Sequence, residues 1–280
     1  MNQKITRISF IGLGRMGKPM AINLLKSGYD VAAYDVRHEP VRELAKLGAR
    51  VAQSPKELAR SSELIALAVV DDAQVVEVLL GADGVIEGVE PETIIALYST
   101  VLPETVQMLA TKFAAKQAHV LDAPISGGEA GARARSLCCM VGGAVQLLER
   151  CRDVFAASAA EIFCMGELGS GAATKLIVQV VTCINMLAAR SRDPCGTMRF
   201  GLYRGTKNIA GQLGAELRRR ELAGSLQARS RSHRGSPTAY EGFSEMPRSR
   251  AALAKDLGLS LPGASLTERL LPRIMGIEEN

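Results

Sequence analysis

The sequence predicts an α/β fold, in which a doubly wound sheet is followed by an all-helical C-terminal domain that is atypical or incomplete. Short apolar strand-like runs alternate with helical segments from residue 5 to about 164. A glycine-rich turn follows the first run, and a helical run from about residue 170 leads away from this region. The chain has 280 residues, of which 47% are hydrophobic and 22% are charged. Such a chain suits two globular domains and is unlike collagen, low-complexity or wholly disordered sequences.

The predicted strands are short and apolar on both faces, as are the strands of a parallel sheet that helices cover on both sides. They comprise residues 8–11, 31–35, 64–70, 93–98, 119–122, 137–141 and 161–164. Helical spacing predicts helices over residues 16–27, 41–47, 55–60, 73–80, 103–115, 145–155 and 172–189. Two helix starts carry capping signals. Ser54, Pro55 and Glu57 form a capping box, and Ser170 is expected to cap the last helix.

A Gly-x-Gly-x-x-Gly pattern stands between the first predicted strand and the first predicted helix. Its members are Gly12, Leu13, Gly14, Arg15, Met16 and Gly17. Alone the pattern is an ordinary glycine loop, but this context is that of a dinucleotide-binding βαβ unit, so the domain is predicted to be Rossmann-type. We expect Gly12 to permit the tight turn, Gly14 to let the backbone approach a pyrophosphate, and Gly17 to let the helix pack on the strand. The free N–H groups of the helix would then face the phosphates.

Asp35 ends the second predicted strand, 21 residues after Gly14. An acidic residue about 20 residues beyond the glycines commonly binds the ribose 2′-hydroxyl of a dinucleotide. A carboxylate there accepts a hydrogen bond from the hydroxyl and repels a 2′-phosphate, so the sequence favours NAD over NADP. Arg37 is the counter-argument, because its guanidinium can reach a 2′-phosphate. NADP therefore remains an alternative cofactor.

Two further segments carry candidate substrate-binding groups. Ser126, Gly127 and Gly128 follow a predicted strand at the carboxyl edge of the sheet, and their hydroxyl and amides suit a substrate carboxylate. Read alone, they form an ordinary turn. Lys175 lies one turn into the last predicted helix among small and apolar residues. It either snorkels to solvent or transfers a proton with a pKa lowered by desolvation. Gln179 lies at i+4 on the same face and can bind the same ligand.

Several separated stretches together resemble the β-hydroxyacid dehydrogenase family, which includes 3-hydroxyisobutyrate dehydrogenase and tartronate semialdehyde reductase. The matching stretches are residues 10–21, 23–28, 122–128, 140–143, 166–175 and 255–257. They occur in the family's order and cover residues 5–189 well and 251–265 adequately. The resemblance implies an oxidoreductase that transfers a hydride between NAD and a small β-hydroxy acid of the 3-hydroxyisobutyrate or tartronate semialdehyde/glycerate type.

The resemblance also implies roles for individual residues. Lys175 matches the family's catalytic lysine, and the turn at residues 126–128 matches its substrate-carboxylate loop. Four further residues match positions that contact or lie beside the cofactor: Val69, Val70, Thr100 and Lys255. Two places depart from the family pattern. Val178 and Gln179 stand where an Asn is usual after the lysine, and Arg135 stands where a Gly is usual.

The chain divides into four predicted segments: an NAD-binding domain over residues 1–165, an interdomain helix over 166–189, an Arg-rich segment over 190–250 and a remnant of the helical domain over 251–280. The Arg-rich segment holds 12 Arg and one Lys against five acidic residues, whereas the rest holds 21 basic and 24 acidic residues. The resemblance stops abruptly at about residue 189 and resumes at about 251. Our hypothesis is that this segment is translated out of frame or disordered. The alternative is a basic insertion that binds nucleic acid or lipid, although it lacks aromatic interleaving.

The remaining expectations concern the whole chain. The absence of a signal-peptide pattern and of an apolar run of about 20 residues predicts a cytoplasmic protein without membrane contact. The six cysteines have no metal-site spacing, which predicts reduced, mostly buried thiols and no metal site. The expected partner is a small hydroxy acid rather than nucleic acid, and the resemblance implies a homodimer or higher homo-oligomer. The alternative function is a dinucleotide-binding protein with impaired or no catalysis, because its C-terminal domain is disrupted.

Overall fold

A computed structural model of the protein describes the backbone of residues 4–191 and the side chains of residues 4–182. The predictions for residues 192–250, for residues 251–280 and for Lys255 lie outside the described residues. In the described part of the chain, no helix is long and apolar enough to cross a bilayer.

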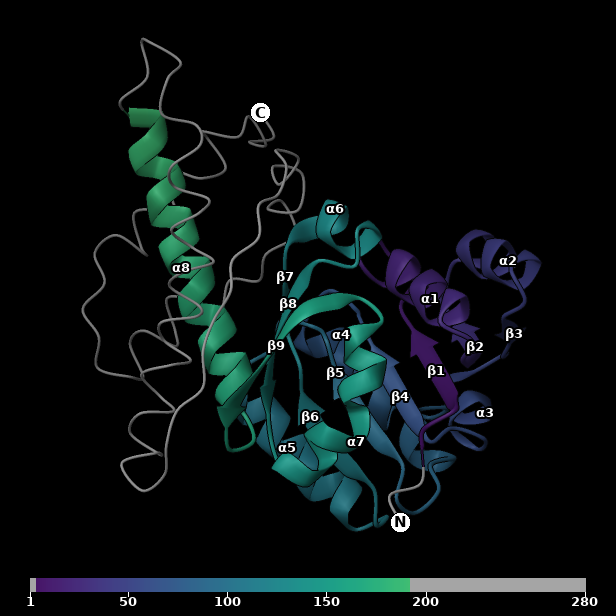
Figure 1. Cartoon of the computed structure of the whole chain (residues 1–280). Coiled ribbons are helices and arrows are strands. Elements are labelled where there is room, and N and C mark those ends of the chain that lie inside the picture. Colours follow the sequence, from purple (N-terminus) through teal and green to yellow (C-terminus); the bar gives the residue numbers. More distant parts are fainter. Residues whose placement is uncertain (1–3, 192–280) are drawn as a thin grey trace, which may run out of the picture.

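Strands and helices alternate along the described chain (Figure 1). The strands are β1 (Arg7–Ile11), β2 (Asp30–Tyr34), β3 (Arg50–Val51), β4 (Leu64–Leu67), β5 (Ile94–Leu97), β6 (His119–Asp122), β7 (Ile125–Ser126), β8 (Leu137–Gly142) and β9 (Ala159–Gly166). The helices are α1 (Gly17–Lys26), α2 (His38–Lys46), α3 (Pro55–Ala59), α4 (Asp72–Leu80), α5 (Pro103–Ala114), α6 (Gly128–Arg133), α7 (Val145–Ala156) and α8 (Ser170–Ser191), with a 3₁₀ turn at Val85–Glu87. The predicted alternation is therefore confirmed.

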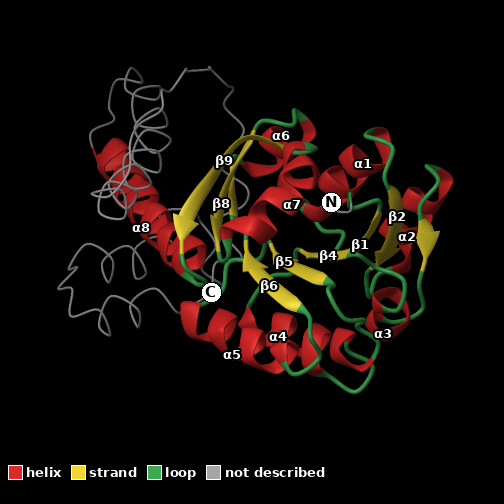
Figure 2. Ribbon diagram, turned by 60° about the horizontal axis from the view of Figure 1, so that its bottom comes forward, coloured by secondary structure: helices red, strands yellow, loops and turns green. Residues whose placement is uncertain are grey.

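Helices cover both faces of a single sheet with the strand order β3-β2-β1-β4-β5-β6-β8-β7, in which β9 pairs with β8. On one face, α1, α2, α6 and α7 bury side chains such as Leu24 and Phe155 against the strands. On the other face, α3, α4 and α5 bury side chains such as Leu79 and Phe113. Figure 2 shows these two helical layers above and below the sheet. The doubly wound architecture follows from strands that are apolar on both faces.

Side chains along each strand alternate between the two layers. Phe10 of β1 belongs to one core cluster and Ile11 to the other. Cys138 and Cys139 likewise lie in different clusters, because successive strand residues point to opposite faces. Four cysteines have described side chains, and the prediction that they are mostly buried is confirmed. Cys138, Cys139 and Cys151 are buried, and Cys164 is half-buried.

Strand direction reverses at one end of the sheet. Strands β1 to β6 are mutually parallel, as predicted. Strand β8 runs antiparallel to both β6 and β7, and β9 runs parallel to β8. The expectation of a wholly parallel sheet is therefore wrong after β6. The connection from β7 to β8 contains only the short helix α6, whereas a parallel return requires a crossover of a dozen or more residues.

Element boundaries differ from the predicted ones where side chains compete with the strand ladder. Strand β4 ends at Leu67 rather than at residue 70, because the Val69 N–H donates to Ser99 Oγ at 2.9 Å. The capping box of α3 forms, with Ser54 Oγ accepting the Glu57 N–H at 3.1 Å. Its reciprocal bond differs from the expected one, because the Glu57 carboxylate accepts the N–H of Gln53 at 2.8 Å. The short elements β3, β7 and α6 are not predicted by the sequence.

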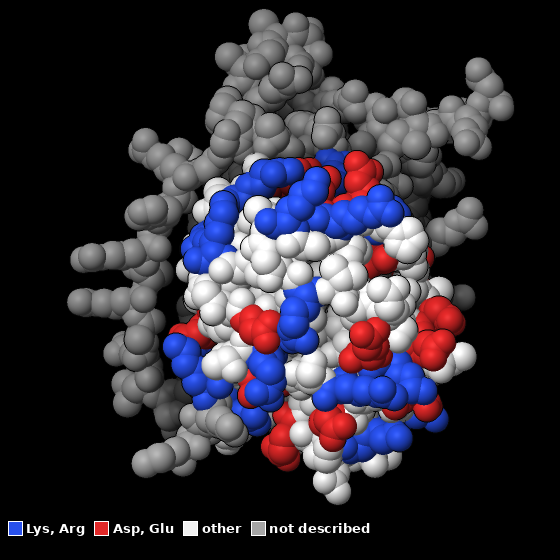
Figure 3. All heavy atoms as spheres, turned by 90° about the vertical axis from the view of Figure 1, so that its right-hand side faces the viewer, with Lys and Arg blue, Asp and Glu red and all other residues white. Residues whose placement is uncertain are grey.

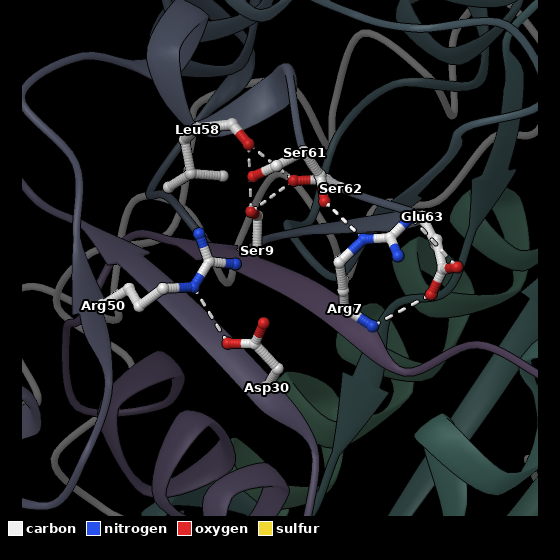
Figure 4. Close-up of polar contacts among 8 residues, drawn as sticks. All are labelled: Arg7, Ser9, Asp30, Arg50, Leu58, Ser61, Ser62 and Glu63. Atoms are coloured by element: carbon white, nitrogen blue, oxygen red, sulfur yellow. Dashed lines mark hydrogen bonds and ion pairs between the residues drawn. The ribbon is translucent and has the colours of Figure 1, made fainter.

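A polar cluster lies towards the amino ends of the parallel strands (Figure 4). The hydroxyls of Ser9 and Ser62 are buried, hydrogen-bond to each other and both reach the carbonyl oxygen of Leu58. Nearby, Arg50 Nε donates to Asp30 Oδ1 at 2.9 Å. These bonds satisfy polar groups at the amino side of the sheet, on the opposite side from the glycine-rich turn that follows β1.

Candidate functional site

The glycine-rich turn joins β1 to α1 and is as compact as predicted. Gly12 has a φ of +87°, and a Cβ at this position would collide with the carbonyl oxygen of Ala68. A Cβ on Gly17 would collide with the Gly12 carbonyl and stand 2.9 Å from Phe10 Cε1 of β1. Both glycines are thus required by the packing of the turn against the sheet.

Gly14 has a different environment from the other two glycines. No atom lies within 4 Å of the place that a Cβ on Gly14 would take, so the space beside this backbone is open. Helix α1 starts three residues later, and its N-cap residue Met16 makes no side-chain capping bond. In the first turn of α1 the Lys18 N–H donates to the Gly14 carbonyl oxygen at 3.1 Å and Pro19 has no N–H, so few helix-start donors remain for a ligand and the open backbone of the turn is the larger contribution. The residues present fit the pyrophosphate of a dinucleotide at this place.

Asp35 lies at the end of β2 and bonds directly to the glycine-rich turn. Its Oδ2 accepts the Leu13 N–H at 2.6 Å, and its carboxylate accepts Arg37 Nε and Nη2 at 3.0 and 3.1 Å. Burial alone would raise the pKa of Asp35, but the hydrogen bonds from Arg37 and Leu13 and the charge of Arg37 lower it below its ordinary value. Asp35 therefore stays ionised at neutral pH, as a 2′-hydroxyl acceptor requires.

Basic side chains surround the mouth of this region. An open cavity of about 310 Å³ is lined by residues of the turn, including Arg15, by Arg37 before α2, and by residues of α1, α2 and α6, including Lys18 and Arg133. Acidic partners accompany them, since Glu129 of α6 pairs with Arg15 at 3.4 Å and with Arg133 at 2.5 Å. On the face that α2 presents, a band of Lys and Arg side chains runs along the upper rim (Figure 3). The rim is therefore basic, but much of its charge is already paired.

The two loops predicted to flank the cofactor are held together by side chains. Val69 and Val70 follow β4, where Val70 is exposed, and Thr100 follows β5, where it is half-buried. Ser99 Oγ accepts the Val69 N–H, which ties one loop to the other. Asp72 Oδ1 of α4 accepts the Leu102 N–H at 3.0 Å. Sequence reasoning missed Ser99 and Asp72, although their places after strands at the carboxyl edge of the sheet offered a signal.

The Ser-Gly-Gly segment is more ordered than the loop that the sequence predicts. Ser126 ends β7 and pairs in register with Cys138 of β8, while Gly128 begins α6. Gly127 and Gly128 have φ values of +135° and +64°. No atom lies within 4 Å of a Cβ built on Gly128, so the backbone there is open to a ligand, as at Gly14. The segment thus presents a hydroxyl and accessible backbone at the point where β7 pairs with β8.

Helix α8 carries Lys175 and begins beside the end of β6. The Gly169 N–H and the Ala172 N–H both donate to the buried carboxylate of Asp122, at 2.9 and 2.7 Å. Ser170, the predicted cap, lies within the helix, and its carbonyl accepts Thr174 Oγ1 at 2.7 Å. A carboxylate 48 residues away in sequence from Ser170 therefore satisfies N–H groups that a local serine was expected to satisfy.

Lys175 and Gln179 lie on a helix that packs against β8 and β9. Val178 of α8 shares a core cluster with Cys138 of β8, the residue that pairs with Ser126. The lysine segment and the serine segment are thereby brought to the same part of the molecule. Gln179 Oε1 is the one buried side-chain oxygen or nitrogen in the described part of the chain without a hydrogen-bond partner. An unsatisfied acceptor one turn beyond Lys175 is suited to a ligand that donates a hydrogen bond.

Arg135 has a backbone conformation that suits glycine, the residue usual at this place in the family that the sequence resembles. Its φ is +55°, in the left-handed region that favours glycine. Its Nη2 reaches the Asn23 carbonyl oxygen at 3.5 Å, which is long for a hydrogen bond. The departure from the family pattern is therefore accommodated with local backbone strain.

Comparison with known proteins identifies the family. Residues 7–166 match the NAD binding domain of 6-phosphogluconate dehydrogenase. Over 270 residues the chain is 31% identical to a probable mitochondrial 3-hydroxyisobutyrate dehydrogenase of Dictyostelium discoideum, and the match covers 94% of this chain and 81% of that relative. The chain belongs to the 3-hydroxyisobutyrate dehydrogenase family. The resemblance predicted from the separated motifs is therefore confirmed. The family consists of oxidoreductases that act on a CH–OH group, and this chain carries its NAD-binding domain.

Two bacterial relatives match a shorter part of the chain. It is 35% identical over 184 residues to 2-(hydroxymethyl)glutarate dehydrogenase of Eubacterium barkeri, and 37% identical over 183 residues to 3-hydroxyisobutyrate dehydrogenase of Pseudomonas aeruginosa. These matches cover 66% and 65% of this chain, and 61% and 59% of the relatives. The chain thus spans about three fifths of the length of these two relatives.

Solved structures share the fold. A Mycobacterium tuberculosis 3-hydroxyisobutyrate dehydrogenase with L-serine superposes with a TM-score of 0.72 at 24% identity, covering 97% of this chain and 94% of that one. A Streptomyces aurantiacus imine reductase superposes with a TM-score of 0.64 at 18% identity, covering 94% and 92%. At such identities the likeness supports the fold alone. It confirms the predicted Rossmann-type α/β class.

Proposed function

We propose that the chain is an NAD-dependent oxidoreductase that transfers a hydride between the cofactor and a small β-hydroxy acid. The substrate is of the 3-hydroxyisobutyrate or tartronate semialdehyde/glycerate type. The observation that carries the proposal is that three segments all begin at the carboxyl edge of the sheet. The glycine-rich turn follows β1, the Ser126 segment follows β6, and the Lys175 helix starts on the carboxylate that ends β6. Ligands of open α/β sheets bind at this edge.

The cofactor is held by the turn and by Asp35. In this proposal the amino end of α1, with its positive dipole end, faces the pyrophosphate, and the open backbone of Gly14 allows its close approach. The ionised Asp35 accepts the ribose hydroxyl, which favours NAD, while Val69, Val70 and Thr100 line the path towards the nicotinamide. When bound, NAD supplies the hydride acceptor of the reaction. NADP is the less favoured cofactor, because its 2′-phosphate would approach a carboxylate.

Substrate orientation and proton transfer fall to the two segments beyond β6. Ser126 and the backbone of Gly127 and Gly128 bind the substrate carboxylate, which holds the carbinol carbon in line for the transfer. In the oxidation, Lys175 takes the proton of the substrate hydroxyl as the hydride leaves the carbinol carbon. In the reverse reaction it returns a proton to the oxygen. Gln179 accepts a hydrogen bond from the substrate, which would satisfy its buried Oε1. No support for impaired catalysis comes from the related proteins.

The mechanism predicts separate effects on turnover and on cofactor binding. Lys175→Ala should lower kcat by about 100-fold or more, because the proton acceptor is lost. Its dissociation constant for NADH, measured by fluorescence titration, should stay within about twofold of the parent. Turnover is followed as NADH absorbance with 3-hydroxyisobutyrate, glycerate and tartronate semialdehyde. Lys26→Ala is the matched control, since Lys26 is an exposed lysine at the end of α1.

Two outcomes of this experiment contradict the proposal in different ways. Turnover retained by Lys175→Ala would remove the proton-transfer role of the lysine. Tight NADH binding by the parent, without turnover of any of the three substrates, would favour a dinucleotide-binding protein without catalysis.

We further propose that the protein acts in the cytoplasm as a homo-oligomer with a small hydroxy acid as its substrate. The absence of a membrane-spanning helix among residues 4–191 is compatible with this location, although some relatives are described as mitochondrial. Size-exclusion chromatography with light scattering measures the oligomeric state directly.

A further inference from the structure

We infer that Asp122 is a positioning residue, which fixes the start of α8 and thereby the place of Lys175 beside the Ser126 segment. Its consequence for turnover rests on the proposed role of Lys175. Asp122 does not belong to the glycine-rich turn, the Ser126–Gly128 segment or the lysine helix itself. It is nonetheless the one side chain in the described part of the chain that hydrogen-bonds to N–H groups on both sides of the first residue of α8.

Both carboxylate oxygens of Asp122 accept hydrogen bonds from the start of α8. Its Oδ1 accepts the N–H of Gly169, just before α8, and its Oδ2 accepts the N–H of Ala172 in the first turn. The side chain is completely buried, so no water competes for these bonds. Two bonds to one rigid carboxylate define both the axial position and the rotation of the first turn. Lys175 lies only three residues beyond Ala172 and follows that rotation.

Two glycines pack closely against the Asp122 carboxylate and restrict its position. Gly142 of β8 pairs with Asp122 across the sheet, and a Cβ on Gly142 would stand 2.5 and 2.7 Å from the two carboxylate oxygens. A Cβ on Gly171 would stand 2.9 Å from Oδ2 and would also collide with the Met140 carbonyl. The ends of β6 and β8 and the start of α8 thus meet around one side chain.

Burial of a carboxylate is unfavourable and needs a compensating arrangement. Desolvation raises the pKa of Asp122, while N–H donors from Gly169, Ala172 and Gly171 oppose that shift. The positive end of the helix dipole favours the same charge. A local serine or threonine would cap a helix at less desolvation cost, but it would not connect α8 to the sheet. Asp122 also precedes Ser126 by four residues, so the same side chain links the two segments proposed to bind substrate.

Two variants disturb the bonds between Asp122 and the start of α8, one by changing the carboxylate and the other by changing a residue packed against it. Asp122→Asn keeps the size of the side chain but turns one acceptor into a donor that faces an N–H group. Gly142→Ala leaves Asp122 in the chain but places a methyl group against its oxygens. Two readouts need no substrate: hydrogen exchange at the amides of residues 169–172, and the rate at which acetic anhydride labels Lys175 relative to Lys26. Steady-state kinetics with 3-hydroxyisobutyrate, glycerate and tartronate semialdehyde and a fluorescence titration with NADH complete the set.

In both variants the amide hydrogens of Gly169 and Ala172 should exchange about 10-fold faster or more. The labelling of Lys175 relative to Lys26 should change by about fivefold or more. The kcat should fall by about 10-fold or more, while the dissociation constant for NADH stays within about twofold. Faster exchange with parental labelling of Lys175 and parental kcat would overturn the inference. A parent that turns over none of the substrates, with labelling that still responds in the variants, would leave the positioning role intact and contradict the proposed function instead.

Ser62→Ala is the control for general destabilisation. Ser62 is buried and hydrogen-bonded like Asp122, but it lies in the cluster towards the amino ends of the strands (Figure 4). The variant should lower the urea midpoint without changing Lys175 labelling or kcat. Equal effects of Ser62→Ala on labelling would show that Lys175 reports stability alone, which would also overturn the inference.

Discussion

At the scale of single residues, we expect the ion pair between Asp35 and Arg37 to determine the choice between NAD and NADP. The Asp35 side chain is 6% exposed, whereas that of Arg37 is 61% exposed, and the two form a bidentate pair. Asp35→Asn removes the charge that repels a 2′-phosphate and loosens the hold on the guanidinium. We expect kcat/KM with NADP to rise relative to NAD by about 10-fold or more, which corresponds to about 1.4 kcal/mol.

Asp30→Asn is the matched control for this exchange. Asp30 begins the same strand and also pairs with an arginine, Arg50, but it lies at the opposite end of β2. Its substitution should leave the ratio of the two cofactors unchanged. If Asp35→Asn left the ratio unchanged as well, the carboxylate would not select the cofactor.

The ionisation of Asp35 makes a prediction about pH. Because the folded-state pKa of Asp35 is lowered, its contribution to stability is present above the unfolded-state value of about 4 and is lost as the pH falls through the folded value. The difference in unfolding free energy between the parent and Asp35→Asn, measured by urea titration, should therefore shrink below about pH 4. The preference for NAD should stay constant between about pH 7.5 and pH 9, where Asp35 and the 2′-phosphate of NADP, with its second pKa of about 6, are both fully ionised. A preference that changed within this range would show that another group titrates in the site.

The strained backbone of Arg135 makes a prediction about stability. Its φ of +55° costs a residue with a side chain about 1 kcal/mol relative to glycine. Arg135→Gly should therefore raise the free energy of unfolding by up to about 1 kcal/mol, less the greater entropy of the unfolded glycine. Gln117→Gly, at a φ of +57° far from the proposed site, is the matched variant and should gain a similar amount in urea titration. A loss of stability in Arg135→Gly alone would show that the contact with Asn23 outweighs the strain.

At the scale of elements, the sequence predicts what periodicity and turn chemistry encode. The strands and helices up to β6 follow from apolar runs, and the glycine-rich turn is recognisable from its spacing and context. Strand β3 has two residues and no period of its own, because its pairing with Ala32 and Ala33 of β2 defines it. The segment Ser126–Gly128 has turn-forming residues, yet pairing with β8 makes Ser126 part of a strand. Such elements depend on partners that a single segment does not reveal.

The site shows the same division between local and long-range signals. Asp35, Lys175 and Gln179 were accessible to spacing arguments. The structure places Lys175 and Gln179 on the expected helix and Asp35 directly after the expected strand, which ends at Tyr34. The role of Asp122 was not accessible, because its bonds reach Gly169 and Ala172, 47 and 50 residues further along the chain. A helix that carries a functional lysine but receives its cap from a strand cannot be distinguished in sequence from one that caps itself. Ser170 was the plausible local choice for this reason.

At the scale of the whole molecule, the basic character of the chain belongs to one segment. Residues 190–250 carry a net charge of +8, and all other residues together carry −3. Nucleic-acid binding driven by phosphate contacts needs such charge to be presented by a folded or binding surface. The charge of the family's NAD-binding domain therefore gives no reason to expect a polyanionic partner, and the Arg-rich segment becomes the object of a separate test.

The coding DNA across residues 185–255 provides that test. Under our hypothesis of a shifted frame, one alternative frame should encode an amphipathic helical pattern that continues from the lysine helix, because apolar residues at a period of 3.6 are needed to build a helical domain. The full chain should also fail to retard random-sequence duplex DNA in an electrophoretic assay at about 150 mM salt. A basic insertion makes the opposite prediction for both measurements. It would leave both alternative frames without helical periodicity, and its DNA binding would weaken steeply with salt as phosphate-bound counterions are released.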